Sequence, residues 1–202
     1  MPCLSRFLSL GSLALALGLA LAAPAPVMAA GAGFQSSVDA AALPKVKQTP
    51  LGLYLTARDA ARVLATHDDV VMIDVRTPEE TDVVGYATVT DANIPIALFK
   101  PEYEVKGGDY VGRPNPDFVP AVKAFIAEKT PSAMIIICRS GHRSAAAVRL
   151  LAKAGIDLPL YEVVDGIEGA KDAQGHRTVD GWKNAGLDWT YDVRPDLLRG
   201  VE

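Results

Sequence analysis

The chain has 202 residues, of which 50% are hydrophobic and 22% are charged, enough for one globular domain with a sizeable core. Its 20 basic and 24 acidic residues give a net charge of −4, which argues against nucleic acid as a partner. A small anionic ligand is still compatible with this charge, because a local group of basic side chains can outweigh a mild global excess of acids.

The first thirty residues have the composition of a secretory signal peptide. Arg6 is their only charged residue, and residues 8–23 form a continuous run of Leu, Ala, Gly and Ser. Two prolines interrupt the run, and small residues that suit cleavage follow. A retained membrane anchor is the alternative, because the run approaches the minimum length for crossing a bilayer. We predict that residues 1–30 are removed and that the protein is periplasmic, with no membrane attachment after removal.

The chain contains two cysteines, Cys3 and Cys138, and the first would leave with the signal peptide. The mature protein would then keep one cysteine, which excludes an internal disulfide. A single cysteine in an exported protein suggests a reactive thiol or an intermolecular bridge. Because the potential ligands are not clustered, we expect no metal and no cofactor.

The beginning of the mature chain is polar and rich in small residues. Residues 31–50 therefore predict an extended or disordered lead-in. Residues 56–66 predict a helix, since Thr56 opens a capping-box spacing and the apolar residues share one face. Residues 70–73 are apolar without alternation, which is typical of a strand covered on both faces.

The next elements are marked by caps and loops. A helix should begin after Thr77, which is followed by proline and two acids. A short strand is expected within residues 87–96, and a charged loop over residues 100–115. Asp117 is expected to cap a helix that ends at Lys129.

The most informative stretch is a strand, loop and helix around Cys138. Residues 135–137 are three isoleucines, and a tight polar loop with one glycine separates Cys138 from an alanine-rich helix predicted to open at Ser144. This arrangement directs loop amides and a helix N-terminus at one point, which attracts anions and favours the thiolate, the nucleophilic form. Arg139 and Arg143 add fixed positive charge.

The remainder predicts a last strand over residues 160–164, a polar loop over residues 171–177 and a short helix over residues 178–185 that buries Trp182. Strands that alternate with helices at this spacing predict an α/β domain with a central, mainly parallel sheet flanked by helices. Function in such sheets gathers beyond the carboxyl ends of the strands, so residues 74–76, the cysteine loop and residues 165–169 should share one rim.

Several chemistries suit a cysteine in this place. The simplest alternative is an inert buried cysteine at the end of a core strand. A cysteine protease would need a partner histidine, and His67, His142 and His176 are not placed for that role. A tyrosine phosphatase would have arginine six positions after the cysteine, where Ser144 stands. Sulfur transfer needs no metal, cofactor or separate base.

The sequence resembles the single-domain rhodaneses, which are sulfurtransferases. The resemblance covers about residues 52–192, and it is carried by three motifs: residues 73–80 (IDVRTPEE), residues 138–144 (CRSGHRS) and residues 164–166 (VDG) with the later Trp182. It implies a three-layer rhodanese-like domain over residues 51–192, between the lead-in and a C-terminal tail over residues 193–202.

The resemblance also implies roles for individual residues. Cys138 would carry the transferred sulfur as a persulfide. The substrate-binding loop would consist of Arg139, Ser140, Gly141, His142 and Arg143, and the structural support of Asp74, Arg76 and Glu80. The implied partners are a small anionic sulfur donor resembling thiosulfate and an acceptor that is a thiol, a protein thiol or cyanide. We expect a monomer.

Three departures from the family pattern affect the interpretation. Residues 85–88 (GYAT) replace the usual Gly-His-Ile-Pro, and Ile167 replaces a second glycine after Gly166. Residues 170–181 look like an insertion that would reshape the mouth of the site. The physiological donor and acceptor are therefore open. A second interpretation of the function, as a sulfur carrier without turnover or a redox-sensing module, is open as well.

Overall fold

The computed structural model describes residues 34–99, 105–106 and 109–201. The predicted signal peptide lies outside these residues. Among the helices of the described ranges, none combines the length and the apolar character needed to cross a bilayer.

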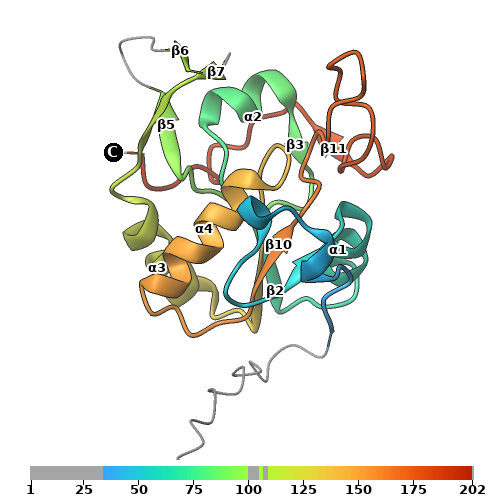
Figure 1. The fold of residues 1–202 in the computed structure, drawn as a ribbon. Coiled ribbons are helices and arrows are strands. Elements are labelled where there is room, and N and C mark those ends of the chain that lie inside the picture. The colour runs from blue at the N-terminus through green and yellow to red at the C-terminus, as the bar shows by residue number, and fades with distance from the viewer. Residues whose placement is uncertain (1–33, 100–104, 107–108, 202) are drawn as a thin grey trace, which may run out of the picture.

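The domain is built on a five-stranded sheet in which every strand pair is parallel. The strands, in spatial order, are β1 (Tyr54–Leu55), β10 (Leu160–Val163), β9 (Ala133–Ile137), β2 (Val70–Asp74) and β4 (Ala92–Asn93). Helices cover both faces, so the predicted α/β class with a central parallel sheet is confirmed (Figure 1).

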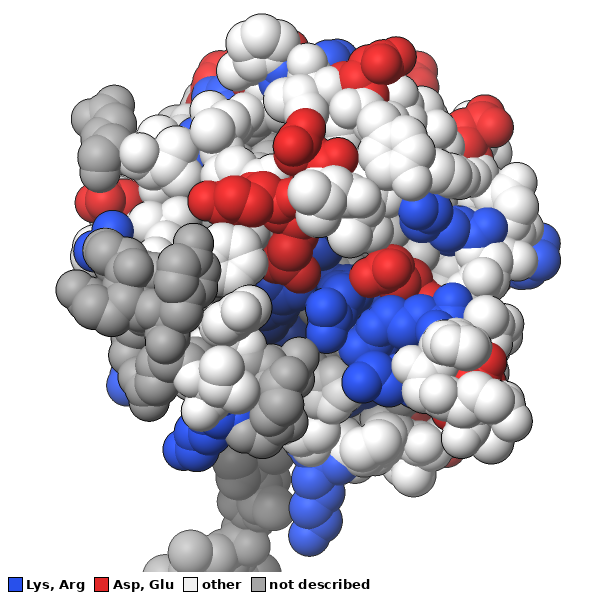
Figure 2. Space-filling view, turned by 90° about the horizontal axis from the view of Figure 1, so that it is seen from above, with Lys and Arg blue, Asp and Glu red and all other residues white. Residues whose placement is uncertain are grey.

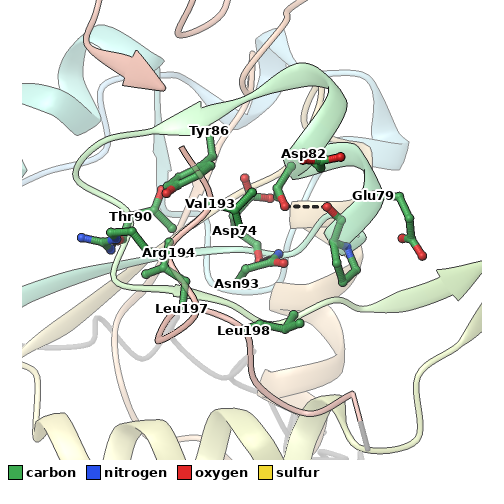
Figure 3. Close-up of a pocket in the computed structure, with 12 residues that line it drawn as sticks. Asp74, Glu79, Asp82, Tyr86, Thr90, Asn93, Val193, Arg194, Leu197 and Leu198 are labelled. Carbon is green, nitrogen blue, oxygen red and sulfur yellow. Dashed lines mark hydrogen bonds between the residues drawn. The ribbon is translucent and has the colours of Figure 1, made fainter. Parts of the chain in front are cut away.

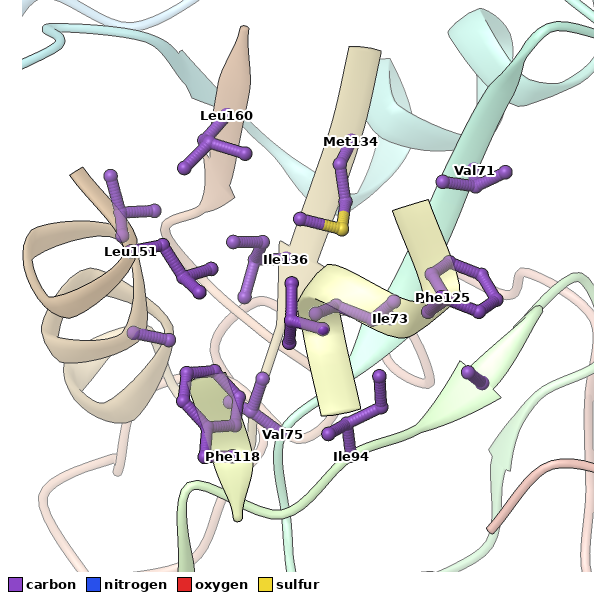
Figure 4. Packing of buried hydrophobic residues seen from close by; sticks show 14 of the residues in the cluster. Val71, Ile73, Val75, Ile94, Phe118, Phe125, Met134, Ile136, Leu151 and Leu160 are labelled. Atoms are coloured by element: carbon purple, nitrogen blue, oxygen red, sulfur yellow. The ribbon is translucent and has the colours of Figure 1, made fainter. Parts of the chain in front are cut away.

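One face of the sheet packs against α3 (Phe118–Lys129) and α4 (His142–Lys153) (Figure 4). The other face packs against α1 (Ala57–Leu64) and the buried Trp182. Side chains alternate along each strand, so Met134 and Ile136 point to the α4 face and their neighbours to the α1 face. Because both faces are covered, β9 is apolar throughout, as the sequence pattern predicted.

Capping interactions explain where the helices begin. Thr56 Oγ1 accepts the backbone N–H of Asp59 (3.2 Å) at the start of α1. Thr77 and Glu80 form a reciprocal capping box at the start of α2 (Pro78–Val84). Asp117 occupies the N-cap position of the helix that ends at Lys129, as predicted, but its backbone is already helical and its side chain makes no cap hydrogen bond.

Helix α4 begins earlier than predicted, at His142 rather than at Ser144. Gly141 is its N-cap and has a left-handed backbone (φ +92°) that turns the loop sharply into the helix. Arg143 and Ser144 therefore lie in the first helical turn, close to the end of β9.

The lead-in differs from the extended tail that the sequence predicted. Its described part contains two short 3-10 helices, η1 (Ala40–Ala42) and η2 (Lys45–Lys47). Lys47 Nζ donates to the Val164 carbonyl (2.8 Å), and Arg149 of α4 donates to the Gln48 carbonyl (2.9 Å). These long-range contacts fold the segment over the end of α4.

The region predicted as a charged loop over residues 100–115 contains strands in its described part. β6 (Val105–Lys106) pairs with β7 (Asp109–Tyr110), and β8 (Gly112–Pro114) pairs with β5 (Ala97–Phe99), both antiparallel. The sequence missed them because each strand has only two or three residues.

Two further predictions near the C-terminus were wrong. Residues 178–185 form turns rather than a helix, because the backbone N–H of Trp182 bonds to the Gly166 carbonyl (2.8 Å) and Gly181 adopts φ +94°. The strand over residues 160–164 is not the last one, since β11 (Trp189–Thr190) pairs with β3 (Tyr86–Ala87). The following tail returns to β4, where the Asn93 N–H donates to the Leu197 carbonyl (2.8 Å).

A buried ion pair closes the end of β2. Arg76 is fully buried, and its Nε and Nη2 donate to the carboxylate of Asp74 at 2.7–3.0 Å. Arg76 Nη2 also donates to the Gly85 carbonyl (2.8 Å), which ties the strand to the end of α2. An unpaired charge at this depth would be costly, because no water is available to replace the partner.

We therefore predict that Asp74→Ala lowers the free energy of unfolding by about 3–5 kcal/mol, as expected when one partner of a buried pair is removed. Chemical denaturation followed by circular dichroism measures this loss. Glu128→Ala is the control, since it removes one partner of the exposed Arg199–Glu128 pair and should have a much smaller effect. Equal losses in the two variants would contradict the prediction.

Candidate active site

Cys138 follows β9 at the carboxyl end of the sheet's central strand. Its Sγ accepts the backbone N–H of Gly141 (3.2 Å) and lies 3.4 Å from the hydroxyl oxygen of Ser144. The side chain is only 1% exposed, so it lies at the floor of the site rather than on an open rim. A backbone amide and the N-terminus of α4 therefore face the sulfur.

The loop keeps its shape because the residues after β10 press against it from outside. The backbone N–H of Ile167 donates to the Cys138 carbonyl (2.9 Å), and the N–H of Glu168 donates to the Arg139 carbonyl (2.9 Å). A Cβ on Gly166 would lie 2.5 Å from the Cys138 carbonyl oxygen, and a Cβ on Gly141 would lie 2.2 Å from the Val164 carbonyl oxygen. The two segments touch only because both positions are glycine.

Asp165 fixes the same segment to two other parts of the domain. Its Oδ1 accepts the N–H of Ala57 at the start of α1 (2.8 Å), and its Oδ2 accepts the N–H of Gly181 (3.2 Å). Burial raises the pKa of Asp165, although these backbone donors oppose the shift. This carboxyl group therefore has a positioning role and does not face the cavity above Cys138.

A cavity of about 740 Å³ opens above the cysteine. Seen from the carboxyl ends of the strands, Lys and Arg side chains gather around a hollow in this face (Figure 2). Basic residues from three separate segments line the cavity: Lys47, Arg139, Arg143, Lys171 and Arg177. Such a site is suited to an anionic ligand.

The structure brings the predicted loop together at this cavity. Cys138, Arg139, Ser140, His142 and Arg143 line it, and Gly141 contributes its N–H to the sulfur. Of the residues assigned to structural support, Glu80 also lines the cavity, while Asp74 and Arg76 lie buried outside it.

Arg143 is paired with Glu80 rather than free to face a ligand. The guanidinium makes a two-pronged interaction with the carboxylate: Nη1 donates to Oε2, and Nη2 donates to Oε1 at 2.6 Å. Burial alone would raise the pKa of Glu80, but the hydrogen bonds and charge of Arg143 outweigh it and lower that pKa. The positive charge of Arg143 is thus largely compensated inside the protein.

The histidines do not pair with the cysteine. Within the described residues, the hydrogen bonds of Cys138 Sγ go to Gly141 and Ser144. His142 points to the cavity side, and burial together with the charges of Lys47 and Arg177 lowers its pKa, which favours the neutral imidazole.

Sequence reasoning missed three of the five basic residues. Lys47 was placed in a flexible lead-in, and Lys171 and Arg177 belong to the insertion over residues 170–181. That insertion was expected to reshape the mouth of the site, and its Ala170, Lys171 and Arg177 do line the cavity. No spacing in the sequence relates Lys47 to Cys138, because only the folded lead-in brings them near.

Sequence reasoning also missed a buried carboxyl group. Glu162 lies in β10 with no exposed surface, and its Oε1 accepts a hydrogen bond from Ser144 Oγ (3.2 Å). Burial raises its pKa to about 8, against smaller opposing effects of Ser144, Lys47 and Arg149. A glutamate inside an otherwise apolar strand was the available signal.

A second cavity of about 420 Å³ lies beside α2, under the C-terminal tail (Figure 3). Tyr86, Val193 and Leu197 contribute to its lining, and Arg194 at its edge donates to the Thr90 carbonyl (2.6 Å). Among the described residues, no cysteine or histidine lines this cavity, whereas Cys138 lines the larger one.

Within the described residues, no group of three or more His, Cys, Asp or Glu side chains is arranged to hold a metal ion. The fold and the site together define an α/β domain that places a cysteine, at the end of its central parallel strand, beneath a basic cavity.

Comparison with known proteins gives the family. The crystal structure of Rv0390 from M. tuberculosis is 31% identical, covers 68% of this chain and 96% of its own, and superposes with a TM-score of 0.52. The chain therefore belongs to the same family as Rv0390. No family model matches it.

Two other similarities are more distant. The uncharacterized protein RP600 of Rickettsia prowazekii (strain Madrid E) is 29% identical over 132 residues, which are 65% of this chain and 92% of that protein. A thiosulfate sulfurtransferase from Pseudomonas aeruginosa is 17% identical over 74% of this chain and 22% of its own, with a TM-score of 0.49.

The contact between the two loop segments leads to a prediction. Gly166→Ala should lower the free energy of unfolding by about 1–2 kcal/mol, because alanine disfavours the left-handed backbone at this position. The overlap of the new Cβ with the Cys138 loop should lower it by an additional ~1–3 kcal/mol. Gly155→Ala is the matched control, since Gly155 has a similar φ (+74°) and open space around its Cβ. Thermal unfolding of both variants measures the difference, and equal losses would show that the contact is not tight.

Proposed function

We propose that this protein is a rhodanese-like sulfurtransferase that moves sulfane sulfur from a small anionic donor to a thiol or cyanide acceptor. One observation carries the proposal: Cys138 Sγ lies at the floor of a basic cavity and accepts the Gly141 N–H at the start of α4. The resemblance of residues 73–80 and 138–144 to rhodanese motifs supports the same chemistry.

The reaction balances without a cofactor. The Cys138 thiolate attacks the outer sulfur of a donor such as thiosulfate; a new S–S bond forms, the S–S bond of the donor breaks, and sulfite leaves with the bonding electrons. The enzyme then holds a persulfide anion. An acceptor thiolate or cyanide attacks the outer sulfur and releases the Cys138 thiolate. Loop amides and the basic cavity would stabilise the negative charge in both steps.

Two alternatives can be compared with the geometry. A phosphatase would direct its loop arginine at the ligand, whereas Arg143 is bound to Glu80. A sulfur carrier without efficient turnover, or a redox-sensing module, is favoured by the 1% exposure of Cys138, because a buried sulfur is reached slowly by small acceptors. The experiment below separates the carrier from the enzyme.

We also propose that the chain is exported to the periplasm through the predicted signal peptide and acts there as a monomer. The apolar run over residues 8–23 supports export. Both statements stay predictions.

The first experiment tests the covalent intermediate. After treatment with thiosulfate and without reductant, mass spectrometry of the mature chain should show one additional sulfur atom on the peptide that contains Cys138. Cys138→Ser should lose both this adduct and all sulfur transfer to cyanide. Turnover by the Cys138→Ser variant would contradict the mechanism, since the mature chain has no second thiol. An adduct on the unmodified protein without steady-state turnover would indicate the carrier.

A second experiment tests the role of charge at Arg143. Glu80→Gln should leave the guanidinium uncompensated and improve kcat/KM for anionic thiosulfate relative to a neutral organic trisulfide by about tenfold, which corresponds to ~1.4 kcal/mol. Glu79→Gln is the control, because it makes the same charge change on the exposed side of α2. Added salt should reduce the gain. Equal changes for both donors would show that the pair only shapes the loop.

A further inference from the structure

Within the described residues, Glu162 is the buried carboxyl group that hydrogen-bonds to the network around the cysteine. It stands in register with Ile136 of β9 and Tyr54 of β1, so its side chain shares the face of the sheet that α4 covers. It has no exposed surface, and its Oε2 has no hydrogen-bond partner within the described residues. Buried polar atoms of this kind are uncommon and call for an explanation.

A single hydroxyl group joins Glu162 to the sulfur. Ser144 Oγ lies 3.4 Å from Cys138 Sγ and 3.2 Å from Glu162 Oε1. A serine hydroxyl has one hydrogen to donate. When Glu162 is ionised, that hydrogen is drawn to the carboxylate, and Ser144 can only accept a hydrogen from the sulfur. When Glu162 is protonated, it can donate to Ser144, and the hydroxyl hydrogen is free to point at a thiolate.

The surrounding charges decide which arrangement is accessible. From η2 and from α4, Lys47 and Arg149 act on Glu162 and favour its ionised form, but burial dominates and raises its pKa to about 8. Tyr54 on β1 is buried beside it, and its hydroxyl oxygen accepts the N–H of Thr49 (2.6 Å). A thiolate at Cys138 would add a second negative charge on the other side of Ser144, and like charges disfavour each other's ionisation.

We propose that Glu162 is a positioning residue that, through the Ser144 hydroxyl, couples its own protonation to the ionisation of Cys138. In the coupled exchange, the thiol proton moves to Ser144 Oγ while the Ser144 hydrogen moves to Glu162, so a thiol and a carboxylate become a thiolate and a carboxylic acid. No external acid or base is consumed. The proposal rests on the proposed function in one respect, since it takes Cys138 as the nucleophile.

The coupling can be measured without any activity assay. In protein labelled with ¹³C at the glutamate carboxyl carbons, the Glu162 signal is identified by its absence in Glu162→Gln and is followed against pH. We expect its midpoint near pH 8 and expect Cys138→Ala to lower it by on the order of one pH unit, the size typical of coupled sites. By reciprocity, each group must shift the other.

A double-mutant cycle assigns the coupling to the hydroxyl group. The shift caused by Cys138→Ala should fall by at least about half in a Ser144→Ala background, because the hydrogen-bonded path is then broken. An unchanged Glu162 midpoint in Cys138→Ala would overturn the coupling. An undiminished shift in the Ser144→Ala background would overturn the relay, since charge acting through space would then explain it.

Alkylation of Cys138 by iodoacetamide provides a second readout. The rate against pH should contain a step at the Glu162 midpoint in the unmodified protein, and Glu162→Gln should lose that step because glutamine does not ionise. Glu79→Gln makes the same charge change outside the network and should keep it. A step that persists in Glu162→Gln would overturn the proposal. Neither readout measures sulfur transfer, so failure here leaves the persulfide experiment to judge the proposed function separately.

Discussion

The site depends on the close contact between two backbone segments, the cysteine loop and the residues that follow β10. Gly141 and Gly166 permit it, because any Cβ at either position would overlap a backbone oxygen of the other segment. The hydrogen bonds from Ile167 and Glu168 then occupy the outward carbonyls of the loop. The N–H of Gly141 is left to face the sulfur. The shape of the loop, the environment of the cysteine and the start of α4 therefore all depend on this one contact.

The charged side chains around this contact follow two arrangements. Inside the domain, arginines are paired with carboxylates, and at the cavity, basic side chains gather. Arg76 and Arg143 are each held by a carboxylate, Asp74 and Glu80 respectively. The lysines and arginines that reach the cavity from the lead-in and the insertion give it its basic character. Pairing limits the cost of burying charge, while the accumulated positive charge favours anions near Cys138. Glu162 departs from this arrangement, because its Oε1 accepts a hydrogen bond from the neutral Ser144 hydroxyl rather than from a basic side chain.

The parts that were predictable from the sequence are those governed by local rules. The strand, loop and helix around Cys138 follow from three isoleucines, one glycine and an alanine-rich run. The caps at Thr56 and Thr77 follow from hydroxyl groups that satisfy helix N–H groups, and both were confirmed. The helix expected over residues 178–185 failed because Trp182 exchanges a helical hydrogen bond for one to Gly166, which local propensity does not report.

By itself, the sequence determined the α/β class, the identity of the nucleophile candidate and the side of the sheet on which it lies, because hydrophobic periodicity and the order of elements leave few arrangements. Only the tertiary structure decided which side chains surround Cys138. It brought Lys47 from the lead-in and Lys171 from the insertion to the same cavity, paired Arg143 with Glu80, and set Glu162 behind Ser144. These relations join residues far apart in the chain, and their energies come from burial and charge that exist only once the domain has folded.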